Sequence, residues 1–166
     1  SPFEHGTVTF EIETSKAIGI QLIRHRSFSF QEFSQRYQDV NKLEDIFESI
    51  ELRAQCEDNR QSSTEIIDPD FTIIGTNTYP ASQAIKAHLL SAHSLYDRLL
   101  EAGVAREQAR MILPLATKTK IHMTGSIRSW IHFLELRDDE HAQKEIRLVA
   151  KEIKKHFIKK FPIISS

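Results

Sequence analysis

An α+β fold is first indicated by the stretch Thr7-Val-Thr-Phe-Glu-Ile-Glu13, in which apolar and polar side chains alternate. A period of two marks a β-strand with one buried face. Ser15 follows as a candidate helix cap, and the apolar residues after it keep helical spacing to about residue 25. The opening of the chain therefore predicts a strand that leads directly into a helix.

The rest of the chain continues this mixture. Residues 27–37 are predicted to be extended or looped, residues 41–57 to form a short helix, and residues 58–80 to form a long loop without a sustained period. Amphipathic spacing then predicts helices from about residue 85 to Gly103, over 106–111, over 127–134, and before Pro162, with a strand over 115–124. Strands and helices without βαβ alternation predict a single α+β domain, 1–166.

Composition excludes several classes of protein. Of the 166 residues, 40% are hydrophobic and 27% are charged, which suits one ordinary core. No apolar run approaches the roughly 18 residues of a membrane span, and no signal peptide is recognisable. Cys56, the single cysteine, cannot form an internal disulfide. We therefore expect a cytoplasmic protein with no membrane partner.

Two familiar kinds of site are not expected. The five glycines are too scattered to form a P-loop or a dinucleotide fingerprint, so a nucleotide cofactor would have to be held another way. His88 and His93 are five residues apart on a predicted helix, a poor spacing for a shared metal ion. We expect no metal site.

The charge is divided unevenly between the two parts of the chain. Residues 1–100 carry a net charge of −6, and residues 101–166 carry +5. One interpretation is a non-catalytic nucleic-acid-binding module that uses the basic part, with Phe28, Phe30 and Phe33 as stacking platforms. Oppositely charged parts can also pair with each other, so charge alone does not select this interpretation and we expect no nucleic acid.

The densest polar cluster comprises Arg24, His25 and Arg26, followed by Glu32, Ser34 and Arg36. If residues 28–36 are extended, the last three side chains share one face at roughly 6 to 7 Å intervals. Such a face can bind a phosphate through its cation and hydroxyl and a ribose through its carboxylate. If the segment is helical, Glu32 and Arg36 form an ordinary exposed pair. The pattern leaves both interpretations open.

The same cluster carries a resemblance to a known family. An Arg-His-Arg motif at 24–26 with Ser34 after seven intervening residues resembles the signature of flavin-dependent thymidylate synthases, the ThyX family. Three further stretches are similar to family motifs in the same order, namely Ser1-Pro-Phe-Glu-His5, Ala109-Arg-Met-Ile-Leu-Pro114 and residues 129–143. The resemblance implies a ThyX-like fold with a mainly antiparallel sheet flanked by helices. The family usually has residues before the first motif, so we expect an N-terminal segment to be missing before Ser1.

The resemblance implies two sets of site residues. Those expected around dUMP are Gln21, Arg24, Glu32, Ser34, Arg36, Arg110 and Arg137. Those expected around FAD are Ser1, Arg24, His25, Arg26, Glu32, Ser126, Arg128 and His132. At three positions where the family often has Asn, this chain has Gln31, Ser126 and His132. These side chains keep hydrogen-bonding capacity but differ in reach.

The implied reaction transfers a one-carbon unit from methylenetetrahydrofolate to C5 of dUMP, with NADPH as the reductant of FAD. Arg137 is the expected catalytic residue, because a permanent cation against the pyrimidine stabilises the charge that develops on the ring. A covalent role for Ser34 would need a base, and His25 is its nearest candidate in the sequence. The family also implies a homotetramer with shared active sites, since a chain of this size offers little interior for dUMP, folate and FAD together.

Overall fold

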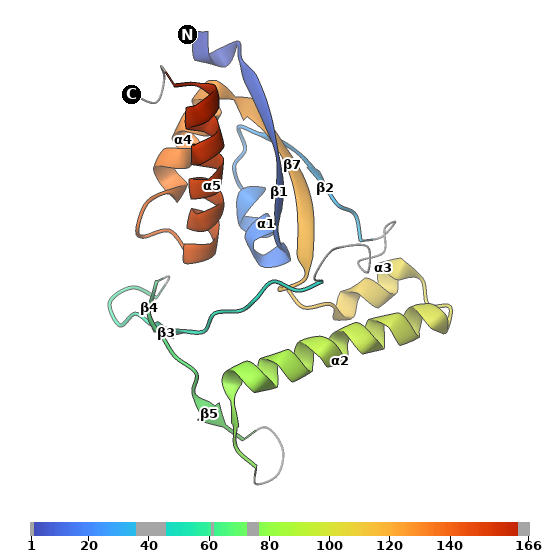
Figure 1. Ribbon diagram of the computed structural model, residues 1–166. Helices are drawn as coiled ribbons and strands as arrows, with labels where there is room; N and C mark the ends of the chain where they lie inside the picture. Colours follow the sequence, from blue (N-terminus) through green and yellow to red (C-terminus); the bar gives the residue numbers. More distant parts are fainter. Residues whose placement is uncertain (1, 36–45, 61, 73–76, 163–166) are drawn as a thin grey trace. The chain divides into compact units, whose positions relative to one another are not determined.

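The computed structural model describes residues 2–35, 46–60, 62–72 and 77–162, and the chain divides into two compact units. Unit 1 comprises residues 1–33 and 119–166, and unit 2 comprises residues 34–118. Strands and helices alternate irregularly along the chain, and the α+β prediction is confirmed (Figure 1). The single-domain organisation stays a prediction.

Unit 1 contains a three-stranded sheet in the order β1 (Thr7–Ser15), β7 (Lys118–Ser126) and β2 (Ser29–Glu32). β2 is antiparallel to β7, with Ser29 opposite Thr124 and Glu32 opposite Ile121. Contacts between the two strands show that β1 is also antiparallel to β7. As the residue numbers rise along β1, the numbers of the residues contacted on β7 fall. The predicted strand over 115–124 begins and ends slightly later than expected.

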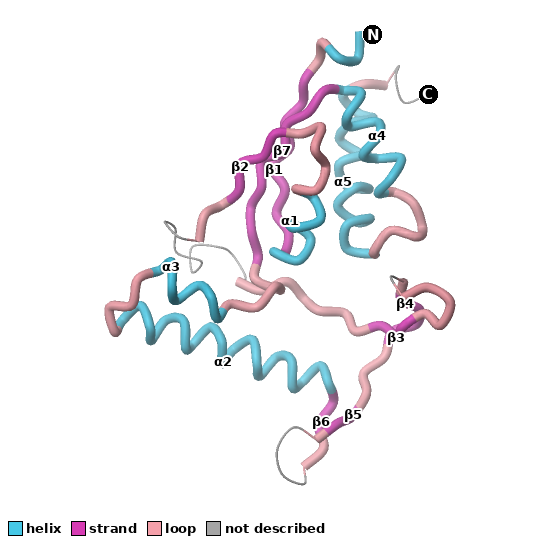
Figure 2. The backbone as a smooth tube through the Cα atoms, turned by 180° about the vertical axis from the view of Figure 1, so that it is seen from behind, coloured by secondary structure: helices cyan, strands magenta, loops and turns pink. Residues whose placement is uncertain are grey.

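The described part of unit 1 also contains four helical elements: η1 (Pro2–Glu4), α1 (Lys16–Leu22), α4 (Ile127–Arg137) and α5 (Lys144–Lys160) (Figures 1 and 2). Alternation along β1 and β7 turns one face of the sheet inward, where Ile121 and Met123 are fully buried with Trp130 and Phe133 of α4. The Trp130 indole donates to the carbonyl of Val8 at 3.1 Å. The core therefore fastens α4 to the sheet.

The other face of the sheet is polar. Lys120 Nζ lies 2.9 Å from a carboxylate oxygen of Glu13 and 3.1 Å from one of Glu11. His122 Nε2 lies 3.1 Å from the second oxygen of Glu11. These charged side chains alternate with the core residues, as the sequence pattern predicts.

Two serines begin helices immediately after strands. The Ser15 hydroxyl accepts from the backbone N–H of Ile18 at 3.4 Å, which confirms the predicted cap of α1. Ser126 does the same for α4, accepting from Ser129 N at 3.2 Å. Each hydroxyl satisfies a helix N–H that has no partner within its own helix.

Unit 2 contains one long helix and several short elements. α2 (Ala81–Glu101) packs against α3 (Arg106–Ala109) and η3 (Arg110–Ile112). The Asp68 carboxylate accepts from the backbone N–H of Ser82 at 2.8 Å, so it caps α2. The helix ends at Glu101, and Gly103 follows shortly after it with a φ of 83°, which favours glycine. The predicted helices over 85–103 and 106–111 are confirmed.

Two predictions in unit 2 differ from the structure. The described part of 41–57, residues 46–57, contains no helix: Phe47 bridges to Thr117, and β3 (Arg53–Gln55) is a strand. Residues 58–80 include strands rather than only loop, because β4 (Ser63–Ile66) pairs with β3, and β5 (Asp70–Phe71) pairs with β6 (Tyr79–Pro80). The physical reason is side-chain bonding to backbone. The amide of Gln55 donates to the carbonyls of Cys56, Asn59 and Ser62 and so fixes a turn that has no hydrophobic period.

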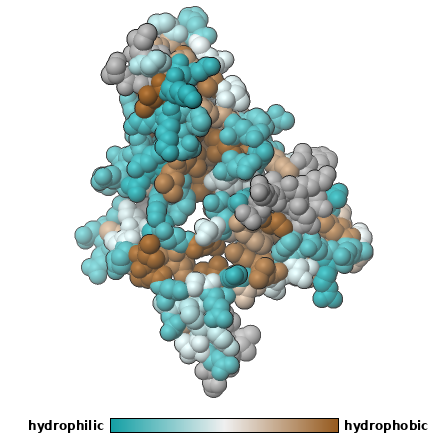
Figure 3. All heavy atoms as spheres, viewed as in Figure 1, coloured by the Kyte–Doolittle hydropathy of each residue, from teal (hydrophilic) through white to brown (hydrophobic). Residues whose placement is uncertain are grey.

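Hydrophobic side chains also reach the surface of unit 2 around β3, β4 and α2 (Figure 3). Ile66 is 68% exposed, Leu90 59% and Leu95 49%. A groove of about 1010 Å³ runs along α2 and is lined in part by Phe47, Ile85 and Leu89. Among the described residues, no helix is both long enough and apolar enough to cross a bilayer.

Candidate active site

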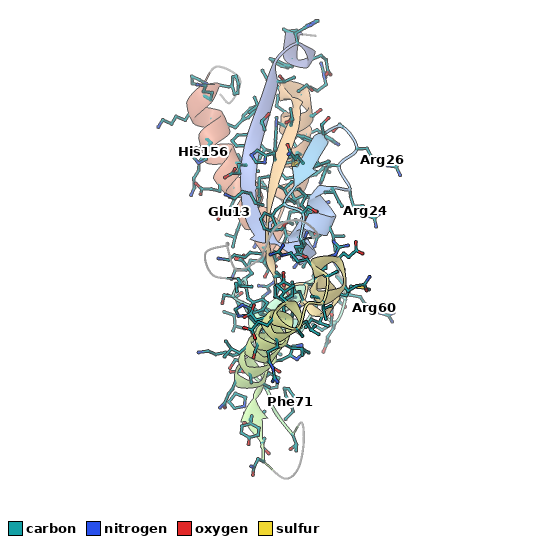
Figure 4. All side chains as sticks on the ribbon, turned by 90° about the vertical axis from the view of Figure 1, so that its right-hand side faces the viewer. Glu13, Arg24, Arg26, Arg60, Phe71 and His156 are labelled. Carbon is teal, nitrogen blue, oxygen red and sulfur yellow. The ribbon has the colours of Figure 1, made fainter. Side chains whose placement is uncertain are left out.

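The turn after α1 presents two arginines to solvent. α1 ends at Leu22, and the backbone N–H groups of Arg24 and His25 bond back to Gln21 and Leu22, which tightens the chain into a turn. Arg24 and Arg26 are exposed, and both side chains project away from the ribbon on the same side in Figure 4. Within the described ranges, neither guanidinium pairs with a carboxylate. The turn therefore offers two cations that no described carboxylate neutralises.

His25, between these arginines, points inward instead. Its ring packs edge-on against Phe133 at a centroid distance of 4.9 Å and against Phe28 at 6.3 Å. Its Nε2 accepts a hydrogen bond from Arg137 Nε at 3.0 Å. Burial lowers the pKa of His25 from its ordinary 6.5 to about 4, and the positive charges of Arg137 and His132 add to the effect. The imidazole is therefore neutral near pH 7.

Arg137 ends α4, and the two carboxylates that follow it are engaged by other side chains. The Asp138 carboxylate accepts from Lys154 Nζ at 2.5 Å. Asp139 accepts from the backbone and ring nitrogens of His141, at 2.8 and 2.7 Å, and these bonds lower the pKa of Asp139. In the part of the chain that the structure describes, Arg137 forms no salt bridge, so its charge is not neutralised.

Glu32 lies at the centre of a small cluster of polar side chains. Its Oε1 accepts from Lys16 Nζ at 2.7 Å and from the Thr119 hydroxyl at 2.9 Å. β2 is a strand and Phe33 N donates to Lys120 O at 2.8 Å, so the extended interpretation holds for residues 29–33. One carboxylate oxygen of Glu32 is thus occupied, and among the described residues the other has no hydrogen-bond partner.

Gln21 lies in a chain of amide hydrogen bonds. Its Nε2 donates to Gln143 Oε1 at 2.6 Å, and Gln143 Nε2 donates to Glu145 Oε2 at 2.8 Å. A carboxylate only accepts, so Glu145 fixes which way the Gln143 amide points, and Gln143 in turn fixes Gln21. No described residue donates to the Gln21 side-chain carbonyl oxygen, so this atom can accept from a ligand.

A pocket of about 560 Å³ lies beside the N-terminal half of α4. Arg128 and His132, one helical turn apart, line it together with Glu4 and Ser27. Glu4 forms an ion pair with Arg128 Nε and accepts from the Ser126 hydroxyl at 3.1 Å. Ser126 and Arg128 thus already have protein partners, whereas Arg24 and Arg26 pair with no carboxylate of the described residues.

The remaining predicted residues lie elsewhere. Arg110 begins η3 in unit 2, is half-buried, and donates from Nε to Glu107 O at 3.4 Å. Ser34 also belongs to unit 2 and is half-buried. Ser1 and Arg36 lie outside the described residues. The base required for a covalent role of Ser34 is not available at His25, because Nε2 of that ring already accepts from Arg137.

The stacking platforms of the nucleic-acid interpretation are not formed as predicted. Phe28 and Phe30 are partly buried against the hydrophobic core, and the Phe28 ring lies 4.7 Å from that of Trp130. Rings packed in this way stabilise the fold rather than receive bases. Phe33 is half-buried.

Four residues near these groups were not singled out from the sequence: Glu4, Lys16, Thr119 and Gln143. Glu4 and Gln143 lie within the motif stretches, so the sequence indicates these two residues but not the residues to which they bond. Thr119 could have been found from strand alternation, since it stands between Lys118 and Lys120 in the predicted strand and therefore faces the opposite side. Nothing in the local pattern marks Lys16.

Comparisons with known proteins agree with the family resemblance of the motifs. Residues 1–163 match the family model described as thymidylate synthase complementing protein. The chain is 43% identical over its whole length to a flavin-dependent thymidylate synthase of Synechocystis sp., covering 73% of that protein. It is 42% identical over 99% of its length to a probable flavin-dependent thymidylate synthase of Paramecium bursaria Chlorella virus 1, covering 72% of it. A relative from Thermosipho africanus, with the same name as the first, is 33% identical over 98% of this chain and is covered to 68%.

Proposed function

Because this chain belongs to the thymidylate synthase complementing protein family, we propose that it is a flavin-dependent thymidylate synthase that methylates dUMP to dTMP. Methylenetetrahydrofolate is the proposed carbon donor and NADPH the proposed reductant of FAD. The observation that carries the proposal is the hydrogen bond from Arg137 to His25, which joins the Arg-His-Arg turn to the end of α4. Two separate motifs with family resemblance thereby meet in one place.

The residues present suit FAD. A pyrophosphate needs cations where no glycine-rich loop exists, and Arg24 and Arg26 are exposed guanidinium groups without carboxylate partners among the described residues. We propose that these two arginines hold FAD together with His25, Glu32, Ser126, Arg128 and His132, and with Ser1. Bound FAD would supply the hydride that the reaction requires.

The proposed dUMP site uses the other polar groups. Gln21, Arg24, Glu32, Ser34, Arg36 and Arg110 would bind the nucleotide, with the arginines taking the phosphate as bidentate donors. The Gln21 carbonyl and the free oxygen of Glu32 are acceptors, which suit an N–H of the base or a ribose hydroxyl. Each acceptor is oriented by a bond to a second side chain.

Arg137 is the proposed catalytic residue. Carbon C5 of uracil becomes nucleophilic as negative charge builds on the ring, and a guanidinium that keeps its full charge stabilises that state. Arg137 meets this requirement because no salt bridge neutralises it within the described chain, and because His25 holds it through a neutral atom. A donor of this kind typically contributes roughly 3 to 4 kcal/mol to lowering the barrier.

We further propose a cytoplasmic homotetramer whose active sites combine residues of several subunits. The exposed Ile66, Leu90 and Leu95, and the open groove along α2, support assembly because large exposed apolar patches commonly mark protein–protein interaction sites. Light scattering on active protein tests this, and an active monomer would refute it.

The test of the activity combines a spectrum and an assay. Purified protein incubated with FAD should keep an absorbance band near 450 nm after desalting, about the usual position for flavin. It should form dTMP only when dUMP, methylenetetrahydrofolate and NADPH are all present. The Arg24→Ala/Arg26→Ala double variant should lose the flavin band, whereas Arg60→Ala/Arg98→Ala, in unit 2, should retain it. Failure of the unaltered protein to bind FAD at micromolar concentration would overturn the proposal.

A further inference from the structure

We propose that His25 is a positioning residue for Arg137, which it holds through a neutral acceptor so that the guanidinium keeps its charge and its two terminal nitrogens for the substrate. The inference rests on the proposed function, but it concerns a contact within this chain. It assigns His25 a task beyond meeting the flavin.

The geometry fixes which atoms do this. Nε2 of His25 accepts from Arg137 Nε at 3.0 Å, so that nitrogen carries no proton and the ring proton lies on Nδ1. The ring cannot easily turn, because Phe133 and Phe28 pack against it edge-on. Since Nε is the inner nitrogen of the guanidinium, the four N–H groups of the two outer nitrogens take no part in this bond.

The surroundings keep the acceptor neutral. The charged or titratable groups around the ring are Arg24 and Arg26 beside it in the turn, and Arg137 and His132 on α4. The carboxylates that follow Arg137 are diverted, Asp138 to Lys154 and Asp139 to His141. Glu135, on the exposed side of α4, faces His132 at 3.9 Å. A protonated His25 would add a further positive charge to this group and would remove the lone pair that Arg137 needs.

A neutral acceptor has a consequence that a carboxylate would not have. A carboxylate would hold Arg137 more tightly but would neutralise much of the positive charge that a developing anion on the substrate needs. Imidazole orients the guanidinium without this opposing charge. A neutral and an anionic acceptor at position 25 should therefore give different rates of dTMP formation.

Three substitutions at position 25 separate two properties of the side chain, its ability to accept a hydrogen bond and its lack of charge. His25→Gln keeps a neutral acceptor at about the reach of Nε2, His25→Glu keeps an acceptor but adds negative charge, and His25→Phe fills the space without an acceptor. Each is compared with His156→Gln, a change at an exposed histidine of α5. Assays are made with FAD loading measured for every variant and with dUMP saturating.

With the kcat for dTMP formation as readout, His25→Gln should stay within about threefold of the unaltered protein. His25→Glu and His25→Phe should each lose roughly tenfold or more, because misplacing or neutralising a catalytic group costs on this scale. His156→Gln should not change kcat. Equal rates for Gln and Phe, or for Gln and Glu, would overturn the inference. If Phe fails to fold, the comparison of Gln with Glu still decides.

A second readout needs no activity. In the ligand-free protein, NMR should detect a slowly exchanging Arg137 Nε–H in the unaltered protein and in His25→Gln, and a rapidly exchanging one in His25→Phe. The His25 ring should titrate well below its ordinary pKa. A ring that titrates near 6.5, or an Arg137 Nε–H that exchanges equally fast in all variants, would refute the positioning role. If these NMR results hold but no dTMP forms, the proposed function fails and the contact stands.

Discussion

Gln21 Nε2 donates to Gln143 Oε1 at 2.6 Å, across 122 residues of sequence. The bond ties the end of α1 to the start of α5. Because Gln143 also donates to Glu145, the amide oxygen of Gln143 is the atom that accepts from Gln21. An amide held by a carboxylate-anchored chain presents one defined atom to a ligand. Here that atom is the carbonyl oxygen of Gln21.

Gln143→Ala should therefore weaken dUMP binding without affecting the chemical step. Without its partner the Gln21 amide can rotate, and we expect KM for dUMP to rise by about three- to tenfold while kcat changes less, as for the loss of a uniform binding contact. Steady-state kinetics measures both values. Gln83→Ala, at an exposed position of α2, is the matched control. A fall in kcat with unchanged KM would contradict this role.

The second prediction concerns Ser126, which caps α4 by accepting from Ser129 N at 3.2 Å. Ser126→Ala removes the acceptor and should lower the free energy of unfolding by about 1 kcal/mol. Ser126→Asn should cost far less, because Asn is an equally good cap. Chemical denaturation of the three proteins provides the measurement.

The cap prediction has a built-in comparison at α1. Ser15 makes the corresponding bond to Ile18 N, so Ser15→Ala should cost a similar amount. If Ser126→Ala leaves stability unchanged while lowering FAD affinity, the hydroxyl acts on the flavin rather than on the helix.

The parts of the fold that could be predicted from sequence are those set by local period and caps. β1 and α1 were predicted because alternation ends at Ser15 and helical spacing begins after it. α5 was predicted from one apolar stripe, whose Ile146, Ile153 and Phe157 are indeed buried. The residues that form each of these signals lie within about 20 residues of one another in the sequence.

What could not be predicted depends on partners far apart in the chain. The β3–β4 hairpin is fixed by hydrogen bonds such as that from Arg53 Nε to Ser63 Oγ at 2.9 Å. The polar side chains that form such bonds produce no hydrophobic period in the sequence. The motifs identified Glu32 and His25, but not that Thr119 and Arg137 are their partners. Resemblance supplies which residues matter, whereas the contacts between them appear only in three dimensions.

The third prediction follows from the pKa of His25. Burial lowers this pKa to about 4, below the 6.5 of the unfolded chain. The unfolded chain therefore binds more protons between these values, so this contribution to stability is present above pH 6.5 and is lost as the pH falls toward 4. Because the ring is only half-buried, solvent screening reduces the expected loss to about 1–2 kcal/mol.

Denaturation of the unaltered protein and of His25→Phe between pH 7.5 and 4.5 measures this contribution. Other histidines and carboxylates titrate in both proteins, so the difference between the two curves isolates His25. The gap in unfolding free energy should narrow or reverse as the pH falls. Parallel curves would show that His25 has the same pKa in the folded and unfolded states.

The last prediction separates binding from chemistry, first at the arginines proposed for the dUMP phosphate. The phosphate does not change during the reaction, so Arg36 and Arg110 should stabilise the ground and transition states nearly equally. Arg36→Ala and Arg110→Ala should therefore raise KM for dUMP more than they lower kcat. Arg98→Ala, on α2, provides a control for loss of a cation.

Arg137 should behave differently, because it is proposed to face the ring where charge develops. Arg137→Ala should lower kcat at saturating dUMP by roughly a hundredfold or more. Arg137→Lys should restore little, since a point charge cannot reproduce a planar fork held at Nε by His25. NADPH oxidation without dUMP should survive the change better than dTMP formation. Both rates are measured on one Arg137→Ala preparation that retains FAD, and dTMP formation near the unaltered rate would show that Arg137 does not activate the pyrimidine.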